Sequence, residues 1–150
     1  MMIYPDTSFL CALYRLQENS PQAAAYFSAM AGPLEVTTLL LYEFRQSVRF
    51  QIRLHLHHAS KGIPKGVGRK MLADLKADLL SGAVVIVPCP WPQVHAAAER
   101  LSELYTEVHG HRAMDILHVA TAQELGAKEF LTFDANQRKL AVADGLKVPL

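Results

Sequence analysis

Short runs of apolar residues alternate along the chain with longer segments in which apolar residues recur every three to four positions. The short runs contain β-branched and aromatic residues, and proline or an acidic residue soon follows most of them, which is typical of buried strands. The predicted strands span residues 2–4, 35–38, 84–87, 130–133 and 146–148. The longer segments predict helices over residues 7–16, 20–30, 39–58, 70–80, 93–108, 112–125 and 135–143.

This alternation of strands and helices predicts an α/β fold. Helices that follow strands one by one form βαβ units, which build a mainly parallel sheet between two layers of helices. A chain of 150 residues is long enough for one such domain, and no repeat or linker divides it. One segment departs from the pattern: residues 60–68 contain three glycines and a proline and predict an exposed loop.

Composition adds few restrictions on function. Hydrophobic residues make up 51% of the chain and charged residues 19%, with a formal net charge of +1, which neither indicates nor excludes a nucleic-acid partner. The first residues lack the basic and apolar regions of a signal peptide, and no apolar run reaches the length of a membrane helix. We therefore predict a cytoplasmic protein without a membrane partner. Cys11 and Cys89 lack metal or redox spacing and are predicted to be reduced.

Four acidic residues occupy similar positions relative to the predicted strands. Asp6 and Asp134 each stand between a strand and a helix, while Glu43 and Asp115 lie in the opening turns of two further helices. Since parallel strands end at one edge of a sheet, these carboxylates are predicted to meet there. Oxygen ligands of this kind favour Mg²⁺ or Mn²⁺. A helix cap or a solvated side chain is the alternative for each acid alone, and both interpretations stay open on this pattern.

Four motifs follow one another along the chain: IYPDTSFL at 3–10, Glu43 early in a long helix, RAMDILHVATA at 112–122 and LTFDANQ at 131–137. Their order and spacing resemble those of PIN-domain ribonucleases, and most of all the VapC-type toxins of bacterial and archaeal toxin–antitoxin pairs. The resemblance implies a single PIN domain over residues 1–150, a three-layer sandwich with a five-stranded, mainly parallel central sheet. One departure is Pro5, where an aliphatic residue is usual; it removes a backbone donor next to Asp6.

The same resemblance implies the chemistry of the site. Asp6, Glu43, Asp115 and Asp134 would form the Mg²⁺ or Mn²⁺ site of an endoribonuclease, with Ser8 and Thr132 at positions where such proteins carry a supporting hydroxyl group. The implied partners are an RNA substrate, a cognate antitoxin and a second copy of the chain in a homodimer. Two alternatives are a catalytically silent PIN-like module that binds RNA or protein, and an RNA-processing nuclease that is not a toxin.

Helix geometry separates two groups of arginines. Arg112 precedes Asp115 by three residues and shares its face of the helix, so it is predicted to contact a substrate phosphate or, alternatively, to brace the acids as a salt bridge. Arg45, Arg49 and Arg53 form a separate stripe, and Arg45 lies roughly 160° around its helix from Glu43. This stripe is predicted to be a solvated face or a surface for a protein partner.

Histidines are predicted to have structural rather than catalytic roles. His55, His57 and His58 lie at a helix end without acids or thiols nearby, which favours a solvated helix terminus over a metal site. His118 lies one turn after Asp115 and is predicted to be a packed side chain. The segment from His55 to Lys70 belongs to none of the motifs, so its role stays open.

Overall fold

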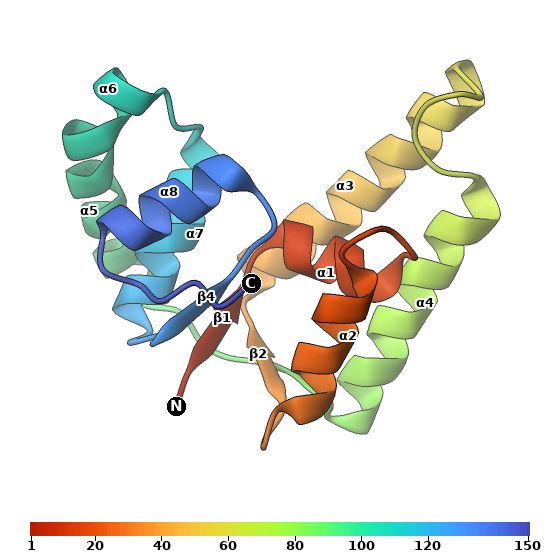
Figure 1. Ribbon diagram of the computed structural model, residues 1–150, viewed down its shortest axis with the longest axis horizontal. Coiled ribbons are helices and arrows are strands. Elements are labelled where there is room, and N and C mark those ends of the chain that lie inside the picture. Colours follow the sequence, from red (N-terminus) through yellow and green to blue (C-terminus); the bar gives the residue numbers. More distant parts are fainter.

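Two pairs of parallel strands form the centre of the computed structural model, which describes residues 1–150. β1 (Ile3–Pro5) pairs with β4 (Glu129–Leu131), and β2 (Leu34–Val36) pairs with β3 (Val84–Ile86). β1 also lies beside β2 (Figure 1). The order across the molecule is therefore β3, β2, β1, β4. The α/β class and the parallel strands agree with the sequence prediction.

The prediction of one continuous five-stranded sheet is wrong. The strands form two separate sheets, and the predicted strand at residues 146–148 is reduced to a single bridge between Glu129 and Lys147. Pro5 explains part of the break between β1 and β2. The N–H of Asp6 donates to Leu131 O of β4 at 2.9 Å. Because successive N–H groups in a strand point to opposite sides, position 5 faces β2, and proline has no N–H to donate there.

Helices pack in two layers, one on each side of the strands (Figure 1). The first layer contains α1 (Thr7–Tyr14), α2 (Ser20–Ala29), α3 (Thr38–His57) and α4 (Lys65–Ser81). The second contains α5 (Trp91–Leu101), a π-helical turn (Ser102–Thr106), α6 (Glu107–His109), α7 (Ala113–Glu124) and α8 (Ala135–Ala143). None of these helices combines the length and apolarity needed to span a membrane.

Each layer has its own hydrophobic core, and the alternation of strand side chains supplies both. Tyr4 and Phe130 are fully buried in the core beside α5, α7 and α8. Leu131, the next residue of β4, points the other way into the core beside α1, α3 and α4, with Leu34 of β2. Burial of apolar surface on both faces holds these short strands in place, since three-residue pairings alone contribute few backbone hydrogen bonds.

The predicted loop at 60–68 is wrong, because α4 begins at Lys65 and the turn before it is packed. Ile63 is buried, and its N–H donates to Gln51 O of α3 at 3.1 Å. A Cβ at Gly68 would lie 2.5 Å from the Ile52 side chain, so glycine lets α4 approach α3 closely. The outer end of α3, this turn and the start of α4 stand clear of the strands (Figure 1). We call residues 45–70 the α3–α4 arm.

Gly62→Ala tests the packing of this arm. Gly62 has φ +65°, and a Cβ there would lie 2.1 Å from Gln51 O, so alanine would combine backbone strain with a clash. We expect the free energy of unfolding to fall by about 2 kcal/mol or more. Gly66→Ala is the matched control, because a Cβ at that position would have no atom within 4 Å and alanine favours helix. Equal melting temperatures for both variants would contradict a packed turn.

Candidate functional site

Asp6 and Asp134 lie together at the carboxyl edge of the β1–β4 pair. The register places Pro5 beside Leu131, so the two strands end side by side and both chains turn into helices there. Asp6 is the N-cap of α1 and accepts from Phe9 N at 2.9 Å. Asp134 is the N-cap of α8 and accepts from Gln137 N at 2.9 Å. Each acid therefore caps a helix and also belongs to a shared edge.

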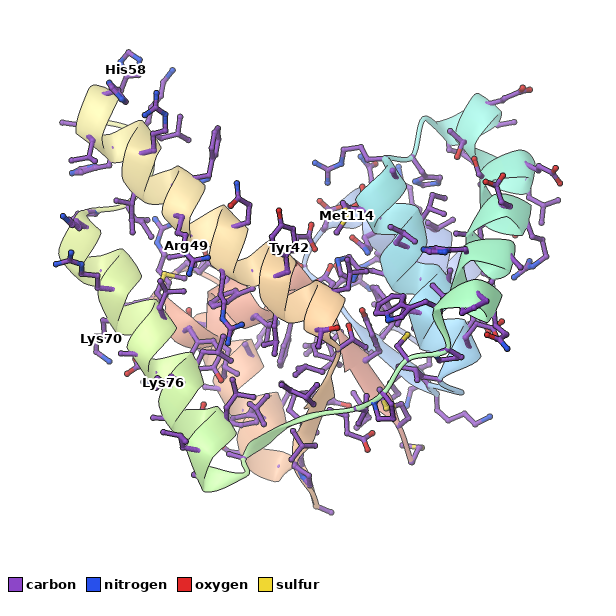
Figure 2. The ribbon with its side chains drawn as sticks, turned by 180° about the vertical axis from the view of Figure 1, so that it is seen from behind. Tyr42, Arg49, His58, Lys70, Lys76 and Met114 are labelled. Atoms are coloured by element: carbon purple, nitrogen blue, oxygen red, sulfur yellow. The ribbon has the colours of Figure 1, made fainter.

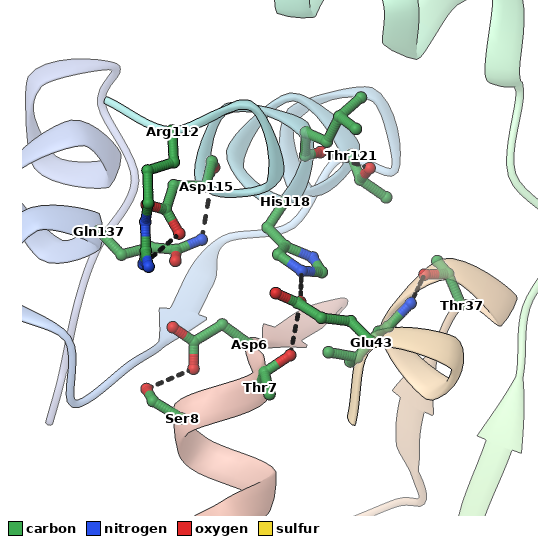
Figure 3. Close-up of polar contacts among 12 residues, drawn as sticks. Asp6, Thr7, Ser8, Thr37, Glu43, Arg112, Asp115, His118, Thr121 and Gln137 are labelled. Carbon is green, nitrogen blue, oxygen red and sulfur yellow. Dashed lines mark hydrogen bonds and ion pairs between the residues drawn. The ribbon is translucent and has the colours of Figure 1, made fainter. Parts of the chain in front are cut away.

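Two hydroxyl groups connect these acids, and they belong to the predicted residues Ser8 and Thr132. Ser8 Oγ donates to Asp6 Oδ1 at 2.6 Å (Figure 3). Thr132 Oγ1 donates to Asp6 Oδ2. Thr132 Oγ1 in turn accepts from Asp134 N at 3.0 Å, while Ser8 Oγ accepts from Phe133 N at 2.8 Å. The hydroxyl groups thus fix the Asp6 carboxylate and tie it to the β4–α8 junction.

The Asp6 carboxylate lies in a poorly solvated position. Its exposed fraction is 2%, and burial raises its pKa to about 6, even though the bonds from Ser8, Thr132 and Phe9 N lower it. Burial disfavours the charged form of a carboxyl group unless a positive charge lies nearby. The negative charge of Asp6 is therefore only partly compensated by its hydrogen bonds.

Glu43 reaches the same region from α3, held between a hydroxyl group and an imidazole. Thr7 Oγ1 donates to Glu43 Oε2 at 2.6 Å, and His118 Nε2 contacts the same oxygen (Figure 3). His118 is 1% exposed, and its Nδ1 lies 2.9 Å from the Tyr4 hydroxyl oxygen. Partial burial raises the pKa of Glu43, but the hydrogen bonds from His118 and Thr7 and the charges of His118 and Arg112 outweigh it and hold the pKa below its usual value.

Asp115 is paired with Arg112 at the start of α7. Arg112 Nε and a terminal guanidinium nitrogen donate to the two carboxylate oxygens at 2.8 and 3.2 Å. The Asp115 side chain is 8% exposed, whereas that of Arg112 is 76% exposed. The hydrogen bonds and charge of Asp115 raise the pKa of Arg112, and the charges of Asp134 and Glu43 raise it further. The charges of three of the four acids therefore act on the Arg112 guanidinium. Of the two roles considered for Arg112 from the sequence, the salt bridge to Asp115 is formed.

A cavity of about 500 Å³ adjoins this edge of the strands. Ser8, Phe133 and Asp134 line it together with Cys11 and residues 17–19. A second cavity, of about 880 Å³, lies instead against Ile3, Glu35 and Glu129 near the opposite ends of the strands, away from the four acids. The chemistry of the carboxylates, rather than cavity size, identifies the candidate site.

Comparison with known proteins identifies the family of the chain. The family model for the PIN domain matches residues 3–143. The chain belongs to the PIN domain family. Two similar solved structures are VapC20 from Mycobacterium tuberculosis, a "Sarcin-Ricin loop cleaving toxin", and FitAcB from Neisseria gonorrhoeae. VapC20 has a TM-score of 0.65 and 19% sequence identity, and the match covers 96% of this chain and 95% of VapC20. FitAcB has a TM-score of 0.64 and 19% sequence identity, and the match covers 98% of this chain and 96% of FitAcB.

A third similar structure is that of FitAB bound to the IR36 DNA fragment. It has a TM-score of 0.58 and 18% identity over 98% of this chain and 93% of its own. At these identities the likeness concerns the fold. No curated protein matches the sequence significantly.

His118 of this PIN domain makes a contact that the sequence did not predict. It is packed, as predicted, but it also contacts Glu43 and joins that acid to Tyr4. The available signal was its spacing of three residues from Asp115, which places both side chains on one face of α7. Thr7 was missed as well, although it directly follows Asp6; its contact with Glu43 depends on the packing of α1 against α3.

The residues of the PIN domain fit a divalent cation by their chemistry. Carboxylate and hydroxyl oxygens surround the buried Asp6, whose charge is only partly compensated, and such oxygens suit Mg²⁺ or Mn²⁺. As the side chains are placed, no three His, Cys, Asp or Glu groups converge to hold an ion. Arg112 supplies the positive charge beside Asp115 instead. Cation binding would therefore require the carboxylates to exchange some of their present partners.

The buried Asp6 predicts a pH-dependent stability in the absence of metal. Its folded pKa of about 6 lies above the ordinary value of 3.8, so the folded state holds the proton more tightly than the unfolded chain. The contribution of Asp6 to the free energy of unfolding should therefore fall as pH rises from about 4 to about 6, whereas that of Glu43, whose pKa is lowered, has the opposite sign. Denaturant titrations in a chelator should show that the free energy of unfolding of the wild type, relative to that of Asp6→Asn, falls over this pH range. Identical pH profiles for the two proteins would contradict the burial of this charge.

Proposed function

We propose that this PIN domain is a metal-dependent endoribonuclease and the toxin of a toxin–antitoxin pair. One observation carries the proposal: hydrogen bonds join the elements that bear the four acids at the carboxyl edge of β1 and β4. Thr132 Oγ1 bonds to Asp6 and to Asp134 N, Thr7 bonds to Glu43, and Gln137 Nε2 bonds to Asp115 O. The similarity of the fold to that of VapC20, a "Sarcin-Ricin loop cleaving toxin", supports the proposal. A silent binding module gains nothing from a cluster of acids that repel one another.

Each acid has a proposed role. Asp6, Asp115 and Asp134 would hold Mg²⁺ or Mn²⁺, and Glu43 would complete the ligand set or orient the attacking water. The cation, when bound, neutralises the phosphodiester and activates water for in-line hydrolysis. Ser8 and Thr132 hold the Asp6 carboxylate at the edge of the strands, so their role is to position a ligand.

The neighbouring residues orient Glu43 and bind the substrate in this proposal. Thr7 and His118 both contact Glu43 Oε2, which leaves Oε1 free of hydrogen bonds to the protein. Arg112 is anchored only through Asp115, and its mostly exposed side chain lies on the solvent side of the acids. We assign Arg112 to the substrate phosphate, which a guanidinium can bind through two parallel hydrogen bonds.

The proposal extends to the partners of the protein. A cognate antitoxin would keep the nuclease inactive in the cytoplasm, and the active form would be a homodimer, as the resemblance to VapC-type toxins implies. RNA is the proposed substrate. A protein with the same cleavage activity but no antitoxin encoded beside it would be an RNA-processing nuclease instead.

Asp115→Asn tests the chemistry. The amide keeps the size of the side chain but removes the charge that would bind the cation, so we expect a folded protein whose RNA cleavage falls by on the order of a hundredfold or more. Asp144→Asn is the matched control, because Asp144 also pairs with an arginine through two bonds, from Arg100 at 3.1 and 3.2 Å, outside the site. Cleavage of a labelled RNA at equal rates by both variants would rule out the proposed role of Asp115.

Thermal unfolding tests the cation independently of cleavage. A ligand that binds only the folded state stabilises it by about 2.7 kcal/mol at a hundred times its dissociation constant. We therefore expect millimolar Mg²⁺ or Mn²⁺ to raise the melting temperature of the wild type and of Asp144→Asn, with little effect on Asp6→Asn. A similar rise in all three proteins would place the bound cation somewhere other than this site.

A further inference from the structure

The α3–α4 arm concentrates positive charge. It contains seven of the 15 Lys and Arg residues and none of the 14 Asp and Glu residues, so it carries +7 within a chain whose net charge is +1. The basic residues are Arg45, Arg49, Arg53, Lys61, Lys65, Arg69 and Lys70. Among them only Lys70 forms an ion pair, with Asp74 at the surface. The positive charge of the chain is therefore concentrated in the arm, and the rest of the chain has a net negative charge.

Exposed aromatic side chains lie on the same helix as the free arginines. Tyr42 is 64% exposed and Phe50 is 53% exposed. At about 100° per residue, Arg49 and Arg53 lie within about 20° of Tyr42 around α3, and Phe50 lies within about 20° of Glu43. Figure 2 shows Tyr42 near the base of α3 and Arg49 further out on the same helix, with Lys70 on the neighbouring α4. A basic and aromatic surface therefore runs outward from the acidic site.

The arm holds these side chains on a fixed scaffold. The turn between α3 and α4 is closed by the hydrogen bond from Ile63 N to Gln51 O, and His55 Nδ1 lies 3.1 Å from Lys61 O. Helical rise places Phe50 about 10 Å and Arg53 about 15 Å along α3 from Glu43. A preordered surface loses less conformational entropy when it binds a ligand.

We propose that the α3–α4 arm binds a single-stranded RNA segment adjoining the bond that is cleaved. In this proposal, which rests on the nuclease function above, Arg49 and Arg53 contact phosphates while Tyr42 and Phe50 stack on unpaired bases. Unpaired cations favour a polyanion, and exposed aromatic rings next to them favour bases that are free of a duplex. Arg45 lies on the far side of α3 from Glu43 and is half-buried, so it is left out of the surface.

Binding in a chelator tests the arm separately from cleavage. The probes are a single-stranded RNA of about 30 nucleotides, longer than the about 4–16 nucleotides that a single-strand-binding fold covers, and one of about 6 nucleotides. We expect the double variant Arg49→Gln/Arg53→Gln to bind the long RNA about tenfold more weakly at low salt. The logarithm of its binding constant should also fall less steeply with the logarithm of the salt concentration. The slope should be smaller by about 1.4 than that of the wild type, because two phosphate contacts are lost. Binding of the short RNA should change little.

Phe50→Ala separates stacking from charge. Loss of one stacked base should weaken binding of the long RNA by about five- to a hundredfold without changing the salt slope. Lys128→Gln/Lys139→Gln is the charge-matched control, since both lysines are exposed and lie outside the arm; it should bind as the wild type does. With Mg²⁺ present, the arm variants should raise the KM for long RNA and leave kcat unchanged.

Three results would overturn the proposal. Unchanged RNA binding with loss of the homodimer or of antitoxin binding would make the arm a protein interface. Equal binding of duplex DNA of the same charge, together with no effect of Phe50→Ala, would make it an unspecific polyanion surface. If Lys128→Gln/Lys139→Gln lost as much RNA affinity as Arg49→Gln/Arg53→Gln, the loss would reflect only the net charge of the protein. Each leaves the nuclease assignment intact, because that assignment is tested separately by the cleavage assay on Asp115→Asn.

Discussion

The parallel pairing of β1 with β4 is the constraint on which the rest of the site depends. The hydrogen bond from Asp6 N to Leu131 O ends both strands at the same level. Each chain then enters a helix, so the N-cap of α1 and the N-cap of α8 become neighbours although 128 residues separate them in the sequence. A shift of one residue in this register would turn Tyr4 and Phe130 out of their core. Core packing therefore fixes the position of the two acids.

The four acids are accommodated by four different kinds of donor. Hydroxyl groups bind Asp6, an imidazole and a hydroxyl group bind Glu43, a guanidinium binds Asp115, and a helix N-terminus binds Asp134. Only the guanidinium is a permanent cation. The site thus folds without a bound ion but keeps an uncompensated charge, most of all on the buried Asp6. In the proposed function, an external cation would neutralise that residual charge.

Local patterns in the sequence were sufficient to predict the helices, the parallel strands and the junctions at which the acids stand. Contacts between distant segments were not predictable in this way. The spacing of His118 from Asp115 indicates the face of α7 on which it lies, but not that Glu43 of α3 lies opposite that face. The glycines of residues 60–68 suggested a loop, yet Gly68 allows close helix packing instead. The five-stranded sheet failed because Pro5 lacks an N–H toward β2 and the last strand is a single bridge.

α3 connects the acidic site to the basic arm within one rigid element. Glu43 lies in its second turn, and Arg49, Phe50 and Arg53 follow on the outer turns. A continuous helix fixes the separation between them at about 10–15 Å, whereas a flexible loop would let it vary. An RNA held by the outer turns would consequently present one bond to the acids rather than a range of bonds. The acids repel a phosphate backbone when no cation is bound, and the arm supplies attraction that does not depend on the cation. Affinity and cleavage can thus reside in separate parts of one small domain.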